Sequence, residues 1–442
     1  MAQLAENLQQ WVARDRPSGG PRWLQELRDR GAARFTALGF PTVRDEDWRF
    51  TSVAPIAGGT FQIGRATALD AAELGGIPYG DASHRIVVVN GQFSAALSRQ
   101  TSLPSGVRAG SLADAIRGRI DGDGMAERYV GQLADIDARA FAALNTAYLH
   151  DGAYVFIPEG VVMEEPLQLL FVSAPAGASG ATVSHARCLV VAGARSQARI
   201  VETYAGVDGA YLTNAVTEVF AGEGAVVDHY KVQQESLSAF HVASMHIHAA
   251  RSATVSSHSF SLGGRLVRND AIALLDGEGA EVTLNGLYLA DGDRLVDNHT
   301  TIDHAKPHCP SHEIYKGILG GKARAVFNGK IIVRPDAQKT DAKQTNRALL
   351  LSDDALINTK PQLEIFADDV KCTHGAAIGQ LDDDALFYLR ARGLTYFEAR
   401  DMLIHAFAGE ILERVRVEPL KAALESELYA QLARDLAEID SA

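Results

Sequence analysis

The sequence predicts a mainly β protein, built as a parallel β-helix with helical segments before and after it. Three observations lead to this fold class: a long stretch from Ala181 to Lys371 without a convincing helix, turn-like segments that recur within it, and alternation of apolar and polar residues between the turns. The turn-like segments are Ala192-Gly193-Ala194, Ala221-Gly222-Glu223-Gly224-Ala225, Ala249-Ala250-Arg251-Ser252-Ala253, Asp276-Gly277-Glu278-Gly279-Ala280 and Gly320-Gly321-Lys322-Ala323.

The first four of these segments recur every 27 to 29 residues, so each repeat unit reads as turn, strand, turn, strand. Within the units, small or branched apolar residues take every second place, as in the run from Ala280 to Leu284. A propeller blade needs about four strands in roughly 40 to 50 residues. The short period therefore favours a solenoid, and we expect the repeat to be interrupted by an insertion between His299 and Leu319.

The chain divides into three expected parts: an N-terminal helical and mixed domain over 1–152, the β-helix over 153–376, and a C-terminal helical domain over 377–442. Helices are expected over 4–38, with a break at Pro17-Ser18-Gly19-Gly20-Pro21, and over 111–150. In the C-terminal part, Thr395 and Glu398 have the spacing of a capping box. The apolar stripe that follows indicates either a buried core or a docking surface for a partner. Its main members are Met402, Leu403, Phe407 and Ile411.

Composition excludes several classes of partner and compartment. The 442-residue chain carries a net charge of −13, which argues against nucleic acid or an anionic membrane as the main partner, because both need a basic patch. The sequence has neither the apolar core of a signal peptide nor a membrane-spanning window. Its three cysteines form no Cys-x-x-Cys pair. We therefore expect a cytoplasmic protein in a reducing compartment.

The segment expected to interrupt the repeat is rich in possible metal ligands. Four of them fall within nine residues: His304, His308, Cys309 and His312. Imidazole and thiolate are the usual ligands of zinc and iron, so a stand-alone metal-binding enzyme is one alternative function. Pro307 and Pro310 hold the segment extended, however, and the four side chains need not converge. The interpretation without a metal is preferred.

Two other enzyme classes find little support. Gly317 to Ala323 looks like a phosphate loop but has the wrong glycine spacing, no Ser or Thr after Lys322, and no strand-to-helix setting. Any ATPase must therefore be a partner. Asp291, Asp293 and Asp297 could line a groove, as in β-helix carbohydrate-active enzymes, but acidic turn residues are common on solenoids.

A Cys-x-His pair stands where the repeat region ends. Cys372 and His374 are two residues apart, so on one strand their side chains point to the same face, about 6 to 7 Å apart along the backbone. Shared metal ligation fits this spacing, and Lys371 beside the thiol would favour the thiolate. A buried cysteine beside a hydrogen-bonded histidine fits equally well, because Cys-x-His alone is a weak signal.

Several runs of this sequence resemble the SufB/SufD family of iron–sulfur cluster assembly scaffolds, and together they cover most of the chain. The runs are Trp48-Arg49-Phe50-Thr51, Tyr315-Lys316-Gly317, Ala337 to Gln344, Asn358 to Ile365, Asp368 to Ala376, Leu386 to Gly393 and Ala399 to Leu403. Within the family, the length of the chain, its few cysteines and Cys372-Thr373-His374 resemble the SufD branch more than SufB.

The resemblance implies a right-handed β-helix between helical domains, in a scaffold subunit that is not itself an enzyme. It implies pairing with SufB through the β-helix and recruitment of the ATPase SufC through the C-terminal helices, for which we expect Met402, Leu403, Phe407 and Ile411 as contacts. It also implies that His374, with Cys372 near it, lies at the interface with SufB where a transient iron–sulfur cluster forms. Flavin binding and a homodimer remain open at this point.

Overall fold

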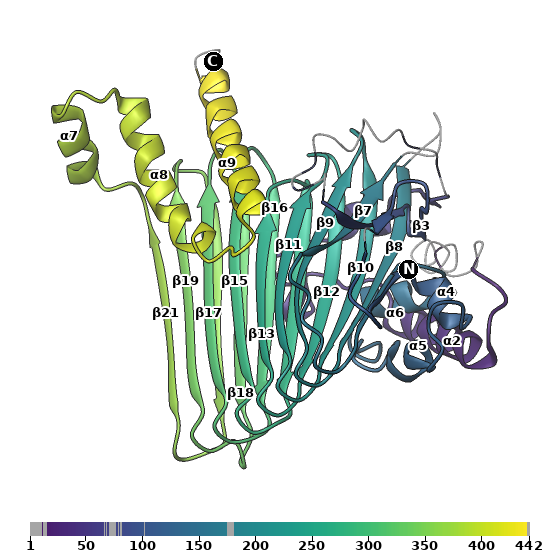
Figure 1. The fold of residues 1–442 in the computed structure, drawn as a ribbon. Coiled ribbons are helices and arrows are strands. Elements are labelled where there is room, and N and C mark those ends of the chain that lie inside the picture. Colours follow the sequence, from purple (N-terminus) through teal and green to yellow (C-terminus); the bar gives the residue numbers. More distant parts are fainter. Residues whose placement is uncertain are drawn as a thin grey trace.

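Two long sheets stacked face to face form a parallel β-solenoid, with helices beside both ends of it (Figure 1). This computed structural model describes residue 11 and residues 16–65, 67, 69, 77, 79, 82–100, 102–174 and 181–439. The chain alternates between the sheets, so that consecutive strands lie in different sheets and strands two apart are hydrogen-bonded. The predicted fold class, mainly β with a solenoid core and flanking helices, is confirmed.

Sheet A has β5 at one end and β20 at the other. Its strands are β20 (Leu356–Ile365), β18 (Arg324–Val333), β16 (Leu295–His304), β14 (Leu266–Leu275), β12 (Phe240–Ala249), β10 (Tyr211–Ala221), β8 (Ala181–Ala192), β6 (Ala153–Ile157) and β5 (Arg108–Ser111), with β1 (Phe61–Ile63) beside β8. All of its pairs are parallel except β5 with β6.

Sheet B has β21 as its last strand. Its strands are β21 (Lys371–Gly379), β19 (Asp341–Leu350), β17 (Pro310–Leu319), β15 (Glu281–Ala290), β13 (Thr254–Ser261), β11 (Val226–Gln234), β9 (Gln197–Gly206), β7 (Leu167–Ser173), β2 (His84–Val89) and β3 (Gln92–Phe93), with β4 (Arg99–Gln100) beside β2. The β2 and β3 strands form an antiparallel hairpin through Asn90 and Gly91.

The expected interruption of the repeat is wrong. Asn269 on β14 lies opposite Asn298 on β16, 29 residues later, and the parallel pairing continues without a break from β16 to β18 and from β17 to β19. Residues 305–309 form the ordinary turn from sheet A to sheet B. The sequence hid this turn because Lys306, Pro307 and His308 stand where the earlier turns carry glycine and alanine.

Columns of side chains run along the inside of the solenoid, because each strand stacks in register on the one before it. One inward column of sheet B contains Val227, Val255, Val282, Ser311 and Ala342. All five side chains are completely buried and all but Ser311 are apolar, which is the arrangement that stabilises a parallel sheet covered on both faces.

The helices before the solenoid lie against the outer face of sheet A (Figure 1). They are α2 (Arg22–Leu38), the 3-10 helix η1 (Glu46–Trp48), α3 (Ala54–Ala57), α4 (Leu112–Ile116), α5 (Met125–Tyr129) and α6 (Ala140–Ala147). Within the predicted helical stretch over 4–38, Trp11 is helical, the chain is not helical over 16–21, where the break was expected, and α2 begins at Arg22; Leu4, Leu8 and Val12 lie outside the described residues. The predicted helix over 111–150 is instead three short helices, because Gly118, Gly124 and Gly131 all adopt positive φ between them.

The helices after the solenoid are α7 (Asp383–Ala391), α8 (Tyr396–Leu412) and α9 (Glu418–Ile439). The predicted capping box at Thr395 and Glu398 is confirmed. One face of α8 and α9 packs on the outer face of sheet B, whereas α7 packs against α8 and projects beyond the strands (Figure 1). Among the described residues, no helix is long and apolar enough to cross a membrane.

Candidate functional site

The open end of the solenoid carries the Cys-x-His pair. Cys372 and His374 lie on β21, the last strand of sheet B, opposite Ala342 and Gln344 on β19. Both side chains face the solenoid interior, where Cys372 packs against a small apolar cluster that includes Ile331 and Ala342. His374 is exposed and Cys372 is half-buried. An exposed imidazole and a half-buried thiol therefore lie on the same face of the last strand, at an end that no further turn of the described chain covers.

The charge on Lys371 does not activate the thiol. Neighbouring residues of a strand point to opposite faces, so the exposed Lys371 side chain leaves the strand on the side away from Cys372. Burial raises the pKa of the Cys372 thiol, the Asp341 carboxylate raises it further, and a backbone hydrogen bond involving Ala342 offsets only part of the shift. The expectation that Lys371 favours the thiolate is wrong. At neutral pH the Cys372 thiol is therefore protonated.

The interior behind His374 contains two polar side chains that the sequence did not single out. Gln344 is the register partner of His374, and Glu313 on β17 is the register partner of Gln344. The Gln344 amide donates a hydrogen bond from Nε2 to Glu313 Oε2 at 2.8 Å, and both side chains are buried. Burial raises the pKa of Glu313 to about 7. The alternation of inward and outward residues along a strand would have placed both side chains in the interior, once the register of β17 was known.

The four residues of the alternative metal cluster are not brought together. His304 and Cys309 point inward and are completely buried, with His304 Nε2 at 2.9 Å from Ser311 Oγ and Cys309 Sγ at 3.2 Å from the Gly277 carbonyl oxygen. His308 is exposed in the turn, and His312 faces outward on β17. The described part of the chain holds no group of three or more His, Cys, Asp or Glu residues arranged to hold a metal ion.

The carboxylate of Asp297 is part of a structural clamp on the outer face of sheet A. Arg268 Nη1 lies 2.7 Å from Asp297 Oδ2, and Thr51 donates a hydrogen bond to the same oxygen. The Arg268 guanidinium also lies over the Trp48 ring, 4.4 Å from its centroid, and donates to the Asp47 carbonyl oxygen. Trp48 and Thr51 of the Trp48-Arg49-Phe50-Thr51 motif thus form a packing corner held by Asp297, whereas Arg49 and Phe50 are exposed.

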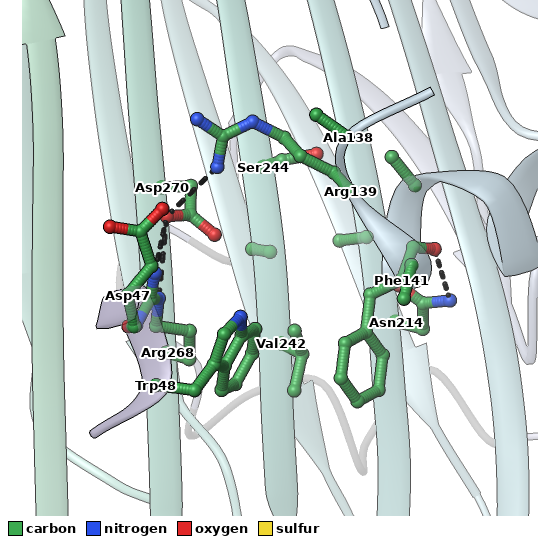
Figure 2. A pocket seen from close by; sticks show the side chains of 14 residues that line it. Asp47, Trp48, Ala138, Arg139, Phe141, Asn214, Val242, Ser244, Arg268 and Asp270 are labelled. Carbon is green, nitrogen blue, oxygen red and sulfur yellow. Dashed lines mark hydrogen bonds and ion pairs between the residues drawn. The ribbon is translucent and has the colours of Figure 1, made fainter. Parts of the chain in front are cut away.

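Beside this clamp is a small pocket, shown in Figure 2, with a volume of about 80 Å³. Arg139 reaches across it to Asp270 at 3.2 Å, and Trp48 and Phe141 close its lower side. The pocket is large enough for a few water molecules only. It joins the N-terminal segment to the solenoid and offers no room for a sugar chain.

The four residues expected to contact the ATPase lie on different faces of α8. Ile411 is completely buried against sheet B, in the same cluster as Ile404 and Ala408. Leu403 and Phe407 are half-buried, and Met402 is 50% exposed. Assigning Ile411 to a partner contact is therefore a mistake for this arrangement of the helices, because the sheet already covers that face.

Exposed aromatic side chains gather instead on α7 and at the start of α8. They are Phe387, Tyr388, Tyr396 and Phe397, and we refer to them together with Met402 as the α7–α8 patch. Phe387 has the largest exposed fraction, 75%. Aromatic anchors of this kind dominate many protein interfaces. Phe387 and Tyr388 fall within the Leu386 to Gly393 run of the family resemblance, but nothing in the sequence indicates that their side chains are exposed.

Lys316 connects α8 to sheet B. Its ammonium lies 2.6 Å from Glu410 and donates to the Phe407 carbonyl oxygen at 2.8 Å, and the lysine side chain is almost completely buried. The hydrogen bond from Lys316 lowers the pKa of Glu410, and Arg347 adds to the shift. This contact fixes the helix to the strand that neighbours β19, and β19 in turn pairs with the strand that carries His374.

Comparison with known proteins identifies the family. The family model for the SufBD core domain of SUF system FeS cluster assembly matches residues 174–407, and that for the SufBD protein N-terminal region matches residues 16–169. This chain belongs to the SufBD family. The resemblance seen in the sequence is thereby confirmed, and with it a role in iron–sulfur cluster assembly by the SUF system.

Individual relatives span most of this SufBD chain. A SufBD family iron–sulfur cluster assembly protein of Synechocystis sp. is 35% identical and covers 91% of this chain and 89% of its own length. The iron–sulfur cluster assembly protein SufD of Escherichia coli is 32% identical over 87% of both chains. The chloroplastic protein ABCI7 of Arabidopsis thaliana is 30% identical, over 93% of this chain and 86% of its own.

Proposed function

We propose that this chain is the SufD-type scaffold subunit of a SUF machinery. It pairs with a SufB-type subunit through the open end of the solenoid, recruits a SufC-type ATPase through its C-terminal helices, and supplies His374 to a transient iron–sulfur cluster at the first interface. The observation that carries the proposal is the position of His374, exposed and inward-facing on the last strand of a solenoid whose end is uncovered.

The open end is suited to a protein partner. The strands β20 and β21 are the last in their sheets, so each presents unpaired backbone groups that can extend a sheet of another chain. Exposed apolar side chains accompany these edges: Leu356, Ile365, Phe366 and Ile378. An exposed apolar edge is a liability unless a partner covers it. A second copy of this chain could occupy the same edge, which makes a homodimer the competing occupant.

A histidine at this position suits temporary ligation. Neutral imidazole can complete the coordination that a partner's thiolates begin, and replacing thiolate by histidine raises the reduction potential of a cluster. Cys372 takes a secondary role, because its thiol is half-buried and its pKa is raised. The iron and sulfide are cargo of the assembly. The chain's own contribution is to present a nitrogen ligand at the interface.

The α7–α8 patch is the proposed docking surface for the ATPase. Helix α7 projects beyond the sheets (Figure 1), whereas α8 is fixed to sheet B by Ile411 and by the Lys316 contact with Glu410. Movement of a bound ATPase would act through α8 on β17 and β19. ATP hydrolysis belongs to the partner in this proposal, and Gly317 to Ala323 supports it, because these residues form the end of β17 and a solenoid turn. Three unpaired cysteines fit a reducing compartment such as the cytoplasm.

The test is co-purification followed by measurement of bound iron, sulfide and ATPase activity. The chain is purified alone, with a SufB-type partner, and with SufB-type and SufC-type partners together. We expect one complex that contains all three proteins, clusters chiefly on that complex, and ATPase activity only when the SufC-type protein is present. Stoichiometric metal or ATPase activity on the isolated chain would contradict the proposal, as would a homodimer that no SufB-type chain can displace.

A further inference from the structure

A single column of inward side chains runs along sheet B to the proposed ligand. Glu313 on β17, Gln344 on β19 and His374 on β21 are successive register partners. Neighbouring strands lie about 4.8 Å apart, so each side chain in such a column can reach the next one. His374 therefore has a buried amide directly behind it, on the side away from solvent.

The carboxamide of Gln344 makes a hydrogen bond through its nitrogen but, within the described part of the chain, none through its oxygen. Its Nε2 donates to Glu313 Oε2 at 2.8 Å. Its Oε1 is buried and has no hydrogen-bond partner among the described residues. A buried carbonyl oxygen without a partner costs about 1 to 3 kcal/mol, so such groups call for an explanation. This oxygen, a hydrogen-bond acceptor with no donor in the part of the chain that the structure describes, belongs to the residue that lies opposite His374 on the adjacent strand.

The solenoid makes specific room for this amide. A Cβ atom on Gly329 of β18 would lie 2.1 Å from Gln344 Nε2, so a larger residue there would force the carboxamide to move. Burial raises the pKa of Glu313 to about 7, so above neutral pH the carboxylate is mostly ionised and accepts the hydrogen bond from Gln344 Nε2. The NH₂ end of Gln344 is then fixed toward Glu313, and the oxygen is left for another donor.

We propose that Gln344 is a positioning residue for His374: its Oε1 accepts the N–H of the imidazole, so that the other ring nitrogen is unprotonated and faces the open end of the solenoid. Histidines that bind metals usually donate their second ring N–H to such an acceptor, which fixes both tautomer and ring orientation. The inference rests on the proposed role of His374 as a ligand. It adds a side chain that never touches the cluster but determines which nitrogen is offered to it.

The first experiment reads the histidine ring directly and needs no cluster. The full chain is labelled with ¹⁵N-histidine, and the His374 signals are assigned by their loss in His374→Ala. At pH 8 we expect one dominant tautomer in the wild type and a mixture in Gln344→Met, which keeps the side-chain length but removes the carbonyl acceptor. If the wild-type ring is already a mixture, or if Gln344→Met leaves the single tautomer intact, the proposal is wrong.

The second experiment measures cluster formation in the complex with SufB-type and SufC-type partners, supplied with ferrous iron and sulfide. Loss of an outer-shell hydrogen bond typically lowers metal affinity by about 10- to 100-fold, so we expect Gln344→Met to lower bound cluster by about 10-fold. The matched control is Asn346→Ala, on the same strand and facing inward, but opposite Ala376 and not His374. We expect this control to stay within about twofold of the wild type, because a histidine-specific effect requires the register partner.

The double variant separates this inference from the proposed function. If Gln344 acts only through His374, Gln344→Met adds nothing in the His374→Ala background. Normal cluster formation by His374→Ala would overturn the proposed ligand, whereas a large loss in His374→Ala with none in Gln344→Met would overturn only the role of Gln344. Equal losses in Asn346→Ala and Gln344→Met would also overturn it. Should Gln344→Met fail to fold, Gln344→Thr, which is too short to reach the ring, takes its place in all arms.

Discussion

Truncation of Ile411 to alanine tests whether α8 is held by its own solenoid. Ile411 is completely buried between α8 and sheet B. The change removes three carbon atoms, each worth about 0.8 kcal/mol when buried, and leaves a cavity, so we expect a loss of about 3 kcal/mol. The lost contacts join the helices to the sheet, so the change should mainly lower the free energy needed for α8 and α9 to open away from sheet B. Since 1.4 kcal/mol is a factor of ten, amide hydrogen exchange in these helices should rise about 100-fold.

The control for this variant is Met402→Ala on the exposed side of the same helix. It should change stability by no more than about 0.5 kcal/mol. It should instead weaken binding of a SufC-type ATPase, measured by surface plasmon resonance, because Met402 belongs to the α7–α8 patch. If Ile411→Ala left hydrogen exchange unchanged and lowered only the ATPase affinity, Ile411 would be a partner contact and the packing argument would be refuted.

Three further predictions concern charges and one turn. The pKa of Glu410 is lower in the folded than in the unfolded chain, so its contact with Lys316 stabilises the fold above about pH 4.5 and is lost as the pH falls through the folded pKa. Amide hydrogen exchange in α8 should therefore rise below that pH. Glu410→Gln should remove this pH dependence of the exchange rate. Arg187 and Glu218 form a fully buried ion pair at 2.5 Å. Arg187→Met leaves the Glu218 carboxylate buried without its charge partner, so the free energy of unfolding measured in denaturant melts should fall by about 3 to 5 kcal/mol. An unchanged free energy of unfolding would mean that water reaches Glu218. His308 adopts positive φ in an exposed turn, and asparagine tolerates that conformation. His308→Asn should therefore leave the fold and the metal content of the purified chain unchanged. A drop in metal content would support a metal site at His304, His308, Cys309 and His312.

The fold was predictable because its repeats leave a local trace. Apolar and polar residues alternate in the run from Ala280 to Leu284, and this run is part of a strand in the structure. The glycine-containing segments between such runs are turns, as predicted. The prediction was wrong where turn chemistry changed. With Lys306, Pro307 and His308 at the next turn, the period was lost, and an ordinary turn was taken for an insertion.

The candidate site was only partly predictable, because exposure and register depend on distant strands. Spacing alone placed Cys372 and His374 on one face of a strand. Sequence could not show that Gln344 lies directly behind His374, since this follows from the pairing of β19 with β21. Nor could the periodicity of α8 show which side of the helix meets sheet B, and Ile411 was therefore assigned to the wrong surface.

The role of His374 as a ligand is tested by the iron and sulfide content of the three-protein complex assembled with His374→Ala. We expect an intact complex, because His374 is an exposed side chain on the last strand, together with a large loss of cluster. Cys372→Ala should lower the content less. Normal cluster content in the His374→Ala complex, or loss of the complex itself, would contradict the claim that this histidine is a ligand at the open end of the solenoid.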